Sequence, residues 1–240
     1  DIHGRITDFY DGVLAFERAL GTTFTTVLHV GDFGVWPDPS RIDRGTRKHD
    51  GAGEFARWRD AGRRVPRETI FIKGNHEDFD WLADSSEVLP GLSLLANGAT
   101  RALQGVGTSI TVGGIGGCWS PRDFERASSS LQGRERSHYT HDEIERLLRG
   151  PPVDLLLLHD APAGVRFGGV AGRRSYVSEA GGLAELVARL RPQLCFFGHH
   201  HEHVRADVGG VPCIGLNLIG GPGHLAAVDA DLRVVATWPE

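Results

Sequence analysis

The sequence contains no methionine and only three cysteines, Cys118, Cys195 and Cys213. None of the cysteines belongs to a CxxC pair, and their number is odd, so a disulfide framework is not expected. A chain without such a framework is typical of a reducing compartment, and we predict a cytoplasmic protein. Because even an initiator methionine is absent and the chain opens on Asp1, we also expect that a segment with a strand precedes the printed sequence.

Long apolar runs and an excess of positive charge are lacking as well. The run over residues 153–158 is far shorter than the roughly 18 residues that span a bilayer, and no signal peptide is visible. We therefore expect a soluble protein without a membrane partner. The net charge of −5 argues against a protein that coats nucleic acids, since such proteins are usually basic, although it leaves room for a local basic groove.

The sequence does contain an alternation of strand and helix patterns, which predicts an α/β fold. A capping box of Thr140 and Glu143 marks the start of one helix, and Thr7 or Asp8 is the expected N-cap of another. Helices are expected over residues 8–20, 54–61, 140–149 and 179–190, and strands over residues 26–30, 69–72, 109–112, 153–158 and 194–197. Residues 33–53 and 120–137 are expected to be long loops, the second of them flexible or lid-like.

Polar residues follow four of the expected strands directly. The strands end in Gly31-Asp32, in Gly74-Asn75-His76-Glu77, in His159-Asp160 and in Gly198 with three histidines. Since ligands of α/β sheets bind beyond the carboxyl ends of the strands, we expect these groups to meet at one edge of a sheet. The opening Asp1-Ile2-His3 has the same character.

The donors in these groups fit a pair of divalent cations. Asp1 and His3 are two residues apart, so their side chains share one side of an extended segment, and His199 and His201 repeat this spacing. Imidazole and carboxylate ligands suit Mn, Fe or Zn. Two divalent cations against the charges of Asp1 and Asp32 leave about +2, which favours an anionic phosphate.

In this order, the motifs D-x-H, G-D, G-N-H-E, H and G-H-x-H resemble those of the calcineurin-like metallophosphoesterases, from Asp1 to about His203. The resemblance implies a single domain over residues 1–240, built as a two-sheet α/β sandwich with helices outside. It implies that Asp1, His3, Asp32 and His201 hold one metal, and that Asp32, Asn75, His159 and His199 hold the other. His76 would contact the phosphate and protonate the leaving oxygen, oriented by Glu77 or a nearby acid.

A finer resemblance concerns the branch of RNA lariat debranching enzymes. Gly31-Asp32-Phe33, the glycines of residues 113–117 and His159-Asp160-Ala161-Pro162 are similar to that branch, which contains phosphodiesterases. The only Asp-Arg-Gly, at Asp43, lies further from Gly-Asp than in the protein phosphatases. We therefore predict a phosphodiesterase that acts through a metal-bridging hydroxide positioned by Asp32, with a nucleotide or RNA among the candidate substrates.

Two alternatives remain open at this stage. A phosphomonoesterase needs an arginine for the additional anionic oxygen, and Arg44, Arg122 and Arg166 are candidates. A non-catalytic scaffold with a structural metal would not need His76, whose presence argues against this alternative. Asn75 and His76 are also expected to bind substrate.

Several other groups have both a functional and a structural interpretation. The glycines of residues 113–117 could cradle a phosphate or form a tight turn. Arg166, Arg173 and Arg174 could bind phosphates or belong to a solvated loop. His200 is expected to support the ligands, His49 and the remaining histidines to have surface or core roles, and Cys118 to be a buried thiol. Some of the following aromatic residues could stack on a base, although packing is preferred: Phe33, Trp36, Phe79, Trp119 and Phe167.

Overall fold

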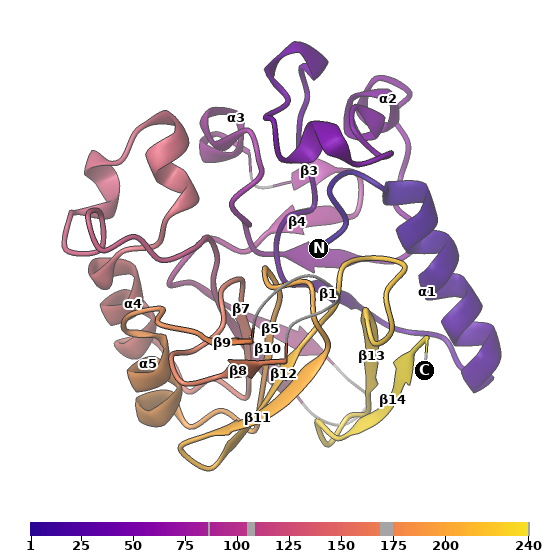
Figure 1. Ribbon diagram of the computed structural model, residues 1–240. Coiled ribbons are helices and arrows are strands. Elements are labelled where there is room, and N and C mark those ends of the chain that lie inside the picture. The colour runs from indigo at the N-terminus through magenta and orange to yellow at the C-terminus, as the bar shows by residue number, and fades with distance from the viewer. Residues whose placement is uncertain (86, 105–108, 169–174, 240) are drawn as a thin grey trace.

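Two β-sheets lie at the centre of the computed structural model, which describes residues 1–85, 87–104, 109–168 and 175–239 (Figure 1). The first sheet has the strand order β1-β2-β4-β3, and the second has the order β11-β12-β10-β7-β6-β5. The strands of the first sheet are β1 (Val27–His29), β2 (Thr69–Phe71), β3 (Glu87–Leu89) and β4 (Leu92–Leu94). Those of the second are β5 (Thr100–Gln104), β6 (Ser109–Ile115), β7 (Leu155–Leu158), β10 (Leu194–Phe197), β11 (Val204–Val208) and β12 (Val211–Gly215).

Helices cover the outer face of each sheet. Buried side chains of α1 (Ile6–Leu20), α2 (Glu54–Asp60) and α3 (Phe79–Ala83) share one core with the first sheet. Those of α4 (His141–Leu148) and α5 (Leu183–Leu190) share another core with the second sheet. Smaller elements are the hairpins β8 (Arg166–Phe167) with β9 (Tyr176–Val177) and β13 (Leu225–Val228) with β14 (Val234–Trp238), and the 3-10 helices Pro39–Arg41, Thr46–Lys48, Ser128–Ser130 and Gly133–Ser137.

Strand β7 shows how the sequence specifies these layers. All four of its leucines are buried. Leu155 and Leu157 pack between the two sheets, whereas Leu156 and Leu158 pack toward α4 and α5. A strand buried on both faces needs such a continuous apolar run rather than an alternating one. The expected two-sheet α/β sandwich with outer helices is confirmed.

The strands that precede the polar motifs run parallel within their sheets. Strand β1 pairs with β2, and β7 pairs with β10, in parallel register. Their carboxyl ends therefore point in the same direction in each sheet. The prediction of one common sheet edge needs correction, because β1 and β2 belong to the first sheet and β7 and β10 to the second.

The start of α1 differs from the prediction. The helix begins at Ile6, and Arg5 precedes it without a side-chain cap, so neither Thr7 nor Asp8 is the N-cap. The side chain of Glu54 from α2 instead accepts hydrogen bonds from the backbone N–H groups of Ile6, at 2.8 Å, and Thr7, at 3.3 Å. A carboxylate near a helix N-terminus satisfies its free donors, and here it comes from a distant helix.

The glycine-rich segment after residue 112 is neither a phosphate cradle nor a tight turn. Gly113 and Gly114 lie inside β6, paired with β7. A Cβ atom on Gly114 would lie 2.5 Å from Cγ2 of Ile72, so the missing side chain allows the two sheets to approach each other.

The segment over residues 120–137, expected to be a long loop, contains two short 3-10 helices and a network of ion pairs. Arg126 contacts Asp123 at 2.7 Å and Glu135 at 3.0 Å. Charge-assisted hydrogen bonds of this kind are stronger than neutral ones and favour this arrangement of the segment. Among the described residues, no helix is long and apolar enough to cross a membrane.

Replacing Glu17 with glutamine is expected to destabilise the protein by about 2 kcal/mol at pH 7, because the buried carboxylate binds Arg67 through both oxygens. The hydrogen bond from Arg67 lowers the pKa of Glu17 below its ordinary value of 4.5, against the opposing effect of burial. The stabilisation is therefore fully present above pH 4.5 and is lost as the pH falls through the lowered pKa. Urea unfolding at pH 7 and in acid measures this difference, with the exposed Asp11→Asn on the same helix as control. An equal loss at both pH values would contradict the ionic contribution.

Candidate metal centre

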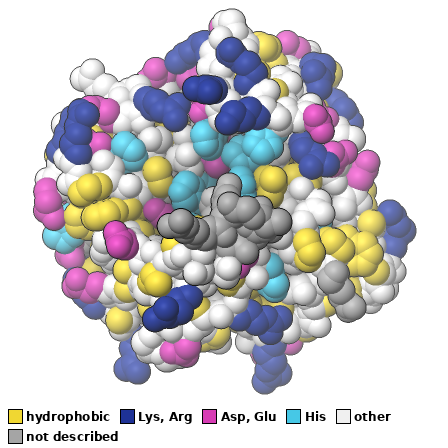
Figure 2. Space-filling view, in the orientation of Figure 1, with side chains coloured by type: hydrophobic (Ala, Val, Ile, Leu, Met, Phe, Trp, Pro, Cys, Tyr) yellow, Lys and Arg dark blue, Asp and Glu magenta, His cyan; other side chains and the backbone are white. Residues whose placement is uncertain are grey.

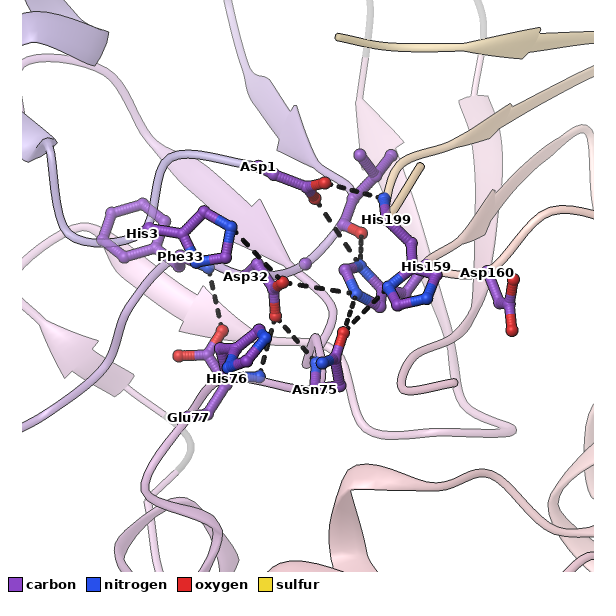
Figure 3. Close-up of polar contacts among 12 residues, drawn as sticks. Asp1, His3, Asp32, Phe33, Asn75, His76, Glu77, His159, Asp160 and His199 are labelled. Carbon is purple, nitrogen blue, oxygen red and sulfur yellow. Dashed lines mark hydrogen bonds and ion pairs between the residues drawn. The ribbon is translucent and has the colours of Figure 1, made fainter. Parts of the chain in front are cut away.

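The polar motifs meet where the carboxyl ends of the two sheets lie side by side (Figure 3). Asp32 follows β1 and Asn75 follows β2, whereas His159 follows β7 and His199 follows β10. The opening segment joins them, because the N–H groups of Ile2 and His3 both donate to the carbonyl oxygen of Asp32. Each sheet thus contributes donors from two parallel strands. The structure brings all seven predicted ligand side chains to this place: Asp1, His3, Asp32, Asn75, His159, His199 and His201.

The first group of donors surrounds the side chain of His3. Nε2 of His3 lies 3.3 Å from Nε2 of His201 and 3.7 Å from Oδ2 of Asp32. Nε2 of His201 lies 3.2 Å from Oδ2 of Asp1. Burial lowers the pKa of His3 to about 2, more than the charge of Asp32 raises it, so the ring is neutral. Asp1, His3, Asp32 and His201 thus lie together, and a metal site formed by these four residues remains a prediction.

The second group of donors surrounds the side-chain oxygen of Asn75. This oxygen lies 2.9 Å from Nε2 of His159 and 2.9 Å from Nδ1 of His199. Nδ1 of His159 contacts the carbonyl oxygen of Val30 at 2.8 Å, so this nitrogen carries the ring proton. Burial lowers the pKa of His159 well below its ordinary value, and Nε2 therefore presents a lone pair to another lone pair on Asn75.

Asp32 belongs to both groups. Its Oδ1 accepts hydrogen bonds from the backbone N–H groups of Asn75, at 2.7 Å, and His76, at 2.8 Å. Its Oδ2 faces Nε2 of His3 on one side and Nε2 of His159, at 3.6 Å, on the other. One oxygen thus fixes the carboxylate, and the other is directed between the two groups.

Gly74 makes this position of Asp32 possible. A Cβ atom on Gly74 would lie 2.0 Å from Oδ1 of Asp32. Only a residue without a side chain allows the backbone after β2 to approach the carboxylate so closely.

Unusual backbone conformations are concentrated in the same residues. His3, Asp32, His199 and His201 all have positive φ angles, between 45° and 66°. Such angles are uncommon for residues with a side chain and cost about 1–3 kcal/mol each. The fold thus holds these side chains in an orientation that the local chain disfavours, as is typical of functional sites.

These observations fit metal cations better than a hydrogen-bond network. Buried atoms without a hydrogen-bond partner include Oδ1 of Asp1 and Nδ1 of His3. Asp1, Asp32 and His159 offer ligand atoms that all lie within 4.8 Å of one another, and these residues bridge the two groups. Neutral imidazoles, carboxylates and an amide oxygen with convergent lone pairs are the ligands that divalent transition metals prefer.

His76 lies beside the first group and is held by an aspartate. Its Nδ1 lies 2.5 Å from Oδ2 of Asp43, which also contacts Arg134 at 3.2 Å. Burial alone would lower the pKa of His76, but the hydrogen bond with Asp43 and the charge of Asp32 raise it above the ordinary value. The proton of Nδ1 is thus directed to Asp43, and Nε2 remains for a substrate.

Of the two possibilities predicted for the acid that orients His76, Glu77 or another acid nearby, the structure excludes Glu77. Its carboxylate accepts backbone hydrogen bonds from Phe33, Gly34 and Val35, the residues that follow Asp32. Glu77 therefore fixes the loop behind Asp32, and Asp43 is the acid that orients His76. The spacing of the motifs did not reveal Asp43, because it lies in a long loop away from the strand ends.

Replacing Glu77 with glutamine is expected to destabilise the metal-loaded protein by about 2 kcal/mol, because an amide NH2 would then face backbone N–H donors. Burial, followed by the charge of Asp32, raises the pKa of Glu77 to about 8, while the N–H donors of Val35 and Phe33 oppose this rise. A cation beside Asp32 would cancel that charge and favour the carboxylate. Thermal unfolding with metal present tests this expectation against Glu179→Gln, which alters an exposed carboxylate. Equal melting temperatures for the two variants would disprove it.

His49 is a site residue that the sequence motifs did not predict. Its ring is stacked on that of His3, with centroids 4.1 Å apart and planes 1° from parallel. The same loop also contacts the site at Gly45, four residues earlier in the chain. A Cβ atom on Gly45 would lie 2.1 Å from Cε1 of His76. His49 lacks a motif context, so only the path of the long loop places it here.

The remaining candidates lie away from the donor groups or have other partners. Arg122 pairs with Glu135 at 3.0 Å, and Arg166 is exposed at the start of β8. Arg173 and Arg174 lie outside the described residues. His200 hydrogen-bonds Asp160 at 2.9 Å and stacks on Phe167, in keeping with a supporting role.

The candidate aromatic residues and Cys118 have mainly structural surroundings. Burial of the following side chains confirms that they pack inside the protein: Phe33, Trp36, Phe79 and Phe167. Trp119 is only partly buried. Cys118 is only partly buried, not buried as predicted, although desolvation still raises its pKa to about 12, which disfavours a reactive thiolate.

A cavity of about 370 Å³ lies behind the donor groups, next to β1, α1 and β13. Its lining is largely apolar and includes Phe9, Leu28, Phe196 and Leu225. Such walls cannot compensate the loss of hydration of a phosphate. The polar centre at the sheet edges, rather than this cavity, is therefore the place for phosphate chemistry.

Comparison with known proteins gives consistent results. The profile of the family described as calcineurin-like phosphoesterase matches residues 1–203. The lariat debranching enzyme of Arabidopsis thaliana is 24% identical over 86% of this chain and 54% of its own length. The corresponding enzyme of Entamoeba histolytica is 21% identical over 99% of this chain and 76% of its own length, and that of Homo sapiens is 24% identical over 83% and 40%. The chain thus spans about half the length of several of these relatives.

Solved structures show the same fold at low sequence identity. The crystal structure of the protein TT1561 of Thermus thermophilus is similar with a TM-score of 0.53 and 14% identity, over 90% of this chain and 85% of that protein. Another crystal structure has a TM-score of 0.57 at 12% identity, over 88% and 86% of the two chains.

Proposed function

Since the chain belongs to the calcineurin-like phosphoesterase family, hydrolases that act on phosphoric ester bonds, we propose that it hydrolyses a phosphodiester with the help of two divalent cations. One observation carries this proposal. Two groups of donors from five separate segments share the Oδ2 atom of Asp32, which is directed between them. Asp1, His3, Asp32 and His201 would hold one cation, and Asp32, Asn75, His159 and His199 the other.

Paired Mn, Fe or Zn cations would lower the pKa of a bound water and stabilise the charge that develops on the phosphoryl group. The protein's own residues prepare the site for this chemistry. Backbone N–H groups fix Asp32, and the carbonyl oxygen of Val30 fixes the tautomer of His159. The rigid donors thus need little reorganisation during the reaction.

His76 is the proposed general acid. The hydrogen bond from its Nδ1 to Asp43 orients the ring, so that Nε2 can donate a proton to the leaving oxygen. The hydrogen bond with Asp43 and the charge of Asp32 raise the pKa of His76 against the effect of burial, which favours the protonated ring. Asn75 follows the same strand and its side chain would also lie beside the phosphate.

Two arginines, Arg122 and Arg134, are already engaged by carboxylates, which speaks against a monoester bound by either of them. A monoester has an additional ionised oxygen, which an arginine usually binds through two hydrogen bonds. Arg122 is paired with Glu135 and Arg134 with Asp43, so both guanidinium groups already bind a carboxylate. The relatives named as lariat debranching enzymes also favour a phosphodiester, and make RNA a candidate substrate.

The proposed activity can be tested on protein that has been stripped of metal and reloaded with Mn, Zn or Fe. We expect hydrolysis of bis(p-nitrophenyl) phosphate to exceed that of p-nitrophenyl phosphate, and to disappear with a chelator. A preference for the monoester would support the phosphomonoesterase alternative. Metal binding without hydrolysis of either ester would favour a non-catalytic scaffold.

A further inference from the structure

The segment Asp43–Gly51 forms a strap across the candidate metal centre. It contacts the site at three points: Gly45 against His76, His49 against His3, and Gly51 against the backbone of Gly4 and Arg5. A Cβ atom on Gly51 would lie 2.2 Å from the backbone nitrogen of Arg5, so this contact is as close as a backbone allows. The strap is therefore anchored on residues of the site itself.

Positive charge lies on the exposed side of this strap. Arg44, Arg47 and Lys48 are all exposed, and no carboxylate within the described parts of the chain lies within salt-bridge distance of them. Asp43 is turned inward to His76, and Arg134 extends the basic surface next to it, with 70% of its side chain exposed. Figure 2 shows Lys and Arg side chains gathered along the upper rim, directly above the histidines. The strap also carries the exposed Asp50, so its three cations and two carboxylates leave a net charge of +1, in a chain whose net charge is −5.

Two of these basic residues, Arg44 and Lys48, are direct chain neighbours of residues that contact the candidate metal centre. Arg44 directly precedes Gly45, which contacts His76, and Lys48 directly precedes His49, which contacts His3. Since successive Cα atoms are about 3.8 Å apart, both side chains start within one residue of the site. Both residues are exposed, so their long, flexible side chains can reach a phosphate next to the scissile one. Arg47 is partly engaged, because it donates to the carbonyl oxygen of Ile42 at 2.6 Å.

We propose that the strap Asp43–Gly51 is a subsite for the flanking phosphates of a single-stranded nucleic acid, bound mainly by Arg44 and Lys48. This inference rests on the proposed phosphodiesterase function and narrows its substrate class. A nucleic-acid strand repeats its anionic phosphate on both sides of the scissile bond, whereas a small diester has only one. Basic side chains that bind such phosphates position the strand without reading its sequence.

The test compares the double variant Arg44→Gln/Lys48→Gln with the wild-type protein. In binding measured by fluorescence anisotropy, the probe is a labelled single-stranded RNA of about ten nucleotides, within the ~4–16 that such sites cover. EDTA prevents turnover. We expect affinity to fall about tenfold, and the slope of log K against log salt to fall by about 1.4, because each single-strand phosphate contact contributes about 0.7.

A matched control removes the same charge elsewhere. Arg18 in the last turn of α1 and Arg205 on β11 are exposed, and neither belongs to the strap. Arg18→Gln/Arg205→Gln should bind the RNA like the wild type. An equal loss in this control, an unchanged affinity in the strap variant, or competition by polyglutamate as strong as that by unlabelled RNA would overturn the inference.

Kinetics separate the subsite from the proposed activity. With metal present, the strap variant should lose at least about fivefold more in kcat/KM on the RNA than on bis(p-nitrophenyl) phosphate. Equal losses on both substrates would place Arg44 and Lys48 at the scissile phosphate instead. If the wild type hydrolyses no diester, the proposed function fails, whereas the binding measurement still decides the subsite.

Discussion

Replacing His76 with alanine is expected to lower kcat by about 10²–10⁴-fold and to leave the metal content unchanged. The variant removes the proton donor for the leaving oxygen, but none of the atoms in the two donor groups. The backbone N–H of residue 76 still donates to Asp32, so the carboxylate keeps its position. Elemental analysis of the reloaded protein and steady-state kinetics measure the two quantities separately.

A variant of Asp43 provides the control for this effect. Asp43→Asn leaves the ring of His76 in place but removes the charge beside Nδ1, so a loss of about tenfold is expected. A diester with a better leaving group needs less protonation, and should reduce the loss in both variants. Equal losses of metal and activity in His76→Ala would show that His76 supports the metal centre instead of acting on the substrate.

Replacing Asp32 with asparagine is expected to abolish binding of both cations without destabilising the metal-free protein. The amide oxygen of the new residue can accept the N–H groups of Asn75 and His76, as Oδ1 does now. Its NH2 group then replaces Oδ2, and faces the lone pairs of His3 and His159. The imidazole nitrogens, which could bind cations in the wild type, would then accept hydrogen bonds from this NH2 group instead.

The activity of Asp32→Asn should fall by at least about 10³-fold. Metal cations supply several kcal/mol of charge stabilisation, and about 1.4 kcal/mol corresponds to a factor of ten in rate. Calorimetric titration with Mn or Zn measures the binding, and thermal unfolding in EDTA measures the metal-free stability. Retention of two tightly bound metals would contradict the bridging position of Asp32. A large drop in metal-free stability would show instead that its charge is needed for folding.

The sequence predicted the ligands better than the groups around them. Asp32, Asn75, His159 and His199 each lie within four residues of the end of a strand, so strand direction places each of them at the carboxyl end of its sheet. The local sequence pattern could not predict that these strands belong to two different sheets. The residues of a strand do not specify the strand with which it pairs. The resemblance to a family supplied the two-sheet sandwich.

Groups that reach the site through long loops could not be predicted in this way. Asp43 and His49 lie between Asp32 and Asn75 in the chain, in a segment without strand or long helix periodicity. Their contacts with His76 and His3 depend on where the loop closes, at Gly45 and Gly51. Glu54 is similar, since it caps α1 from another helix and replaces the local cap that the sequence predicted.

The left-handed backbone of His3, Asp32, His199 and His201 has an evolutionary consequence. Glycine or asparagine adopts such φ angles more readily, so these substitutions would relieve backbone strain in the apoprotein while removing side chains of the proposed metal site. A screen that rewards thermal resistance alone should therefore drift toward inactive variants with changes at these residues. Screening in the presence of the metal would select for thermal resistance and metal binding together. Bound metal stabilises the folded protein only when these histidines and the aspartate are present.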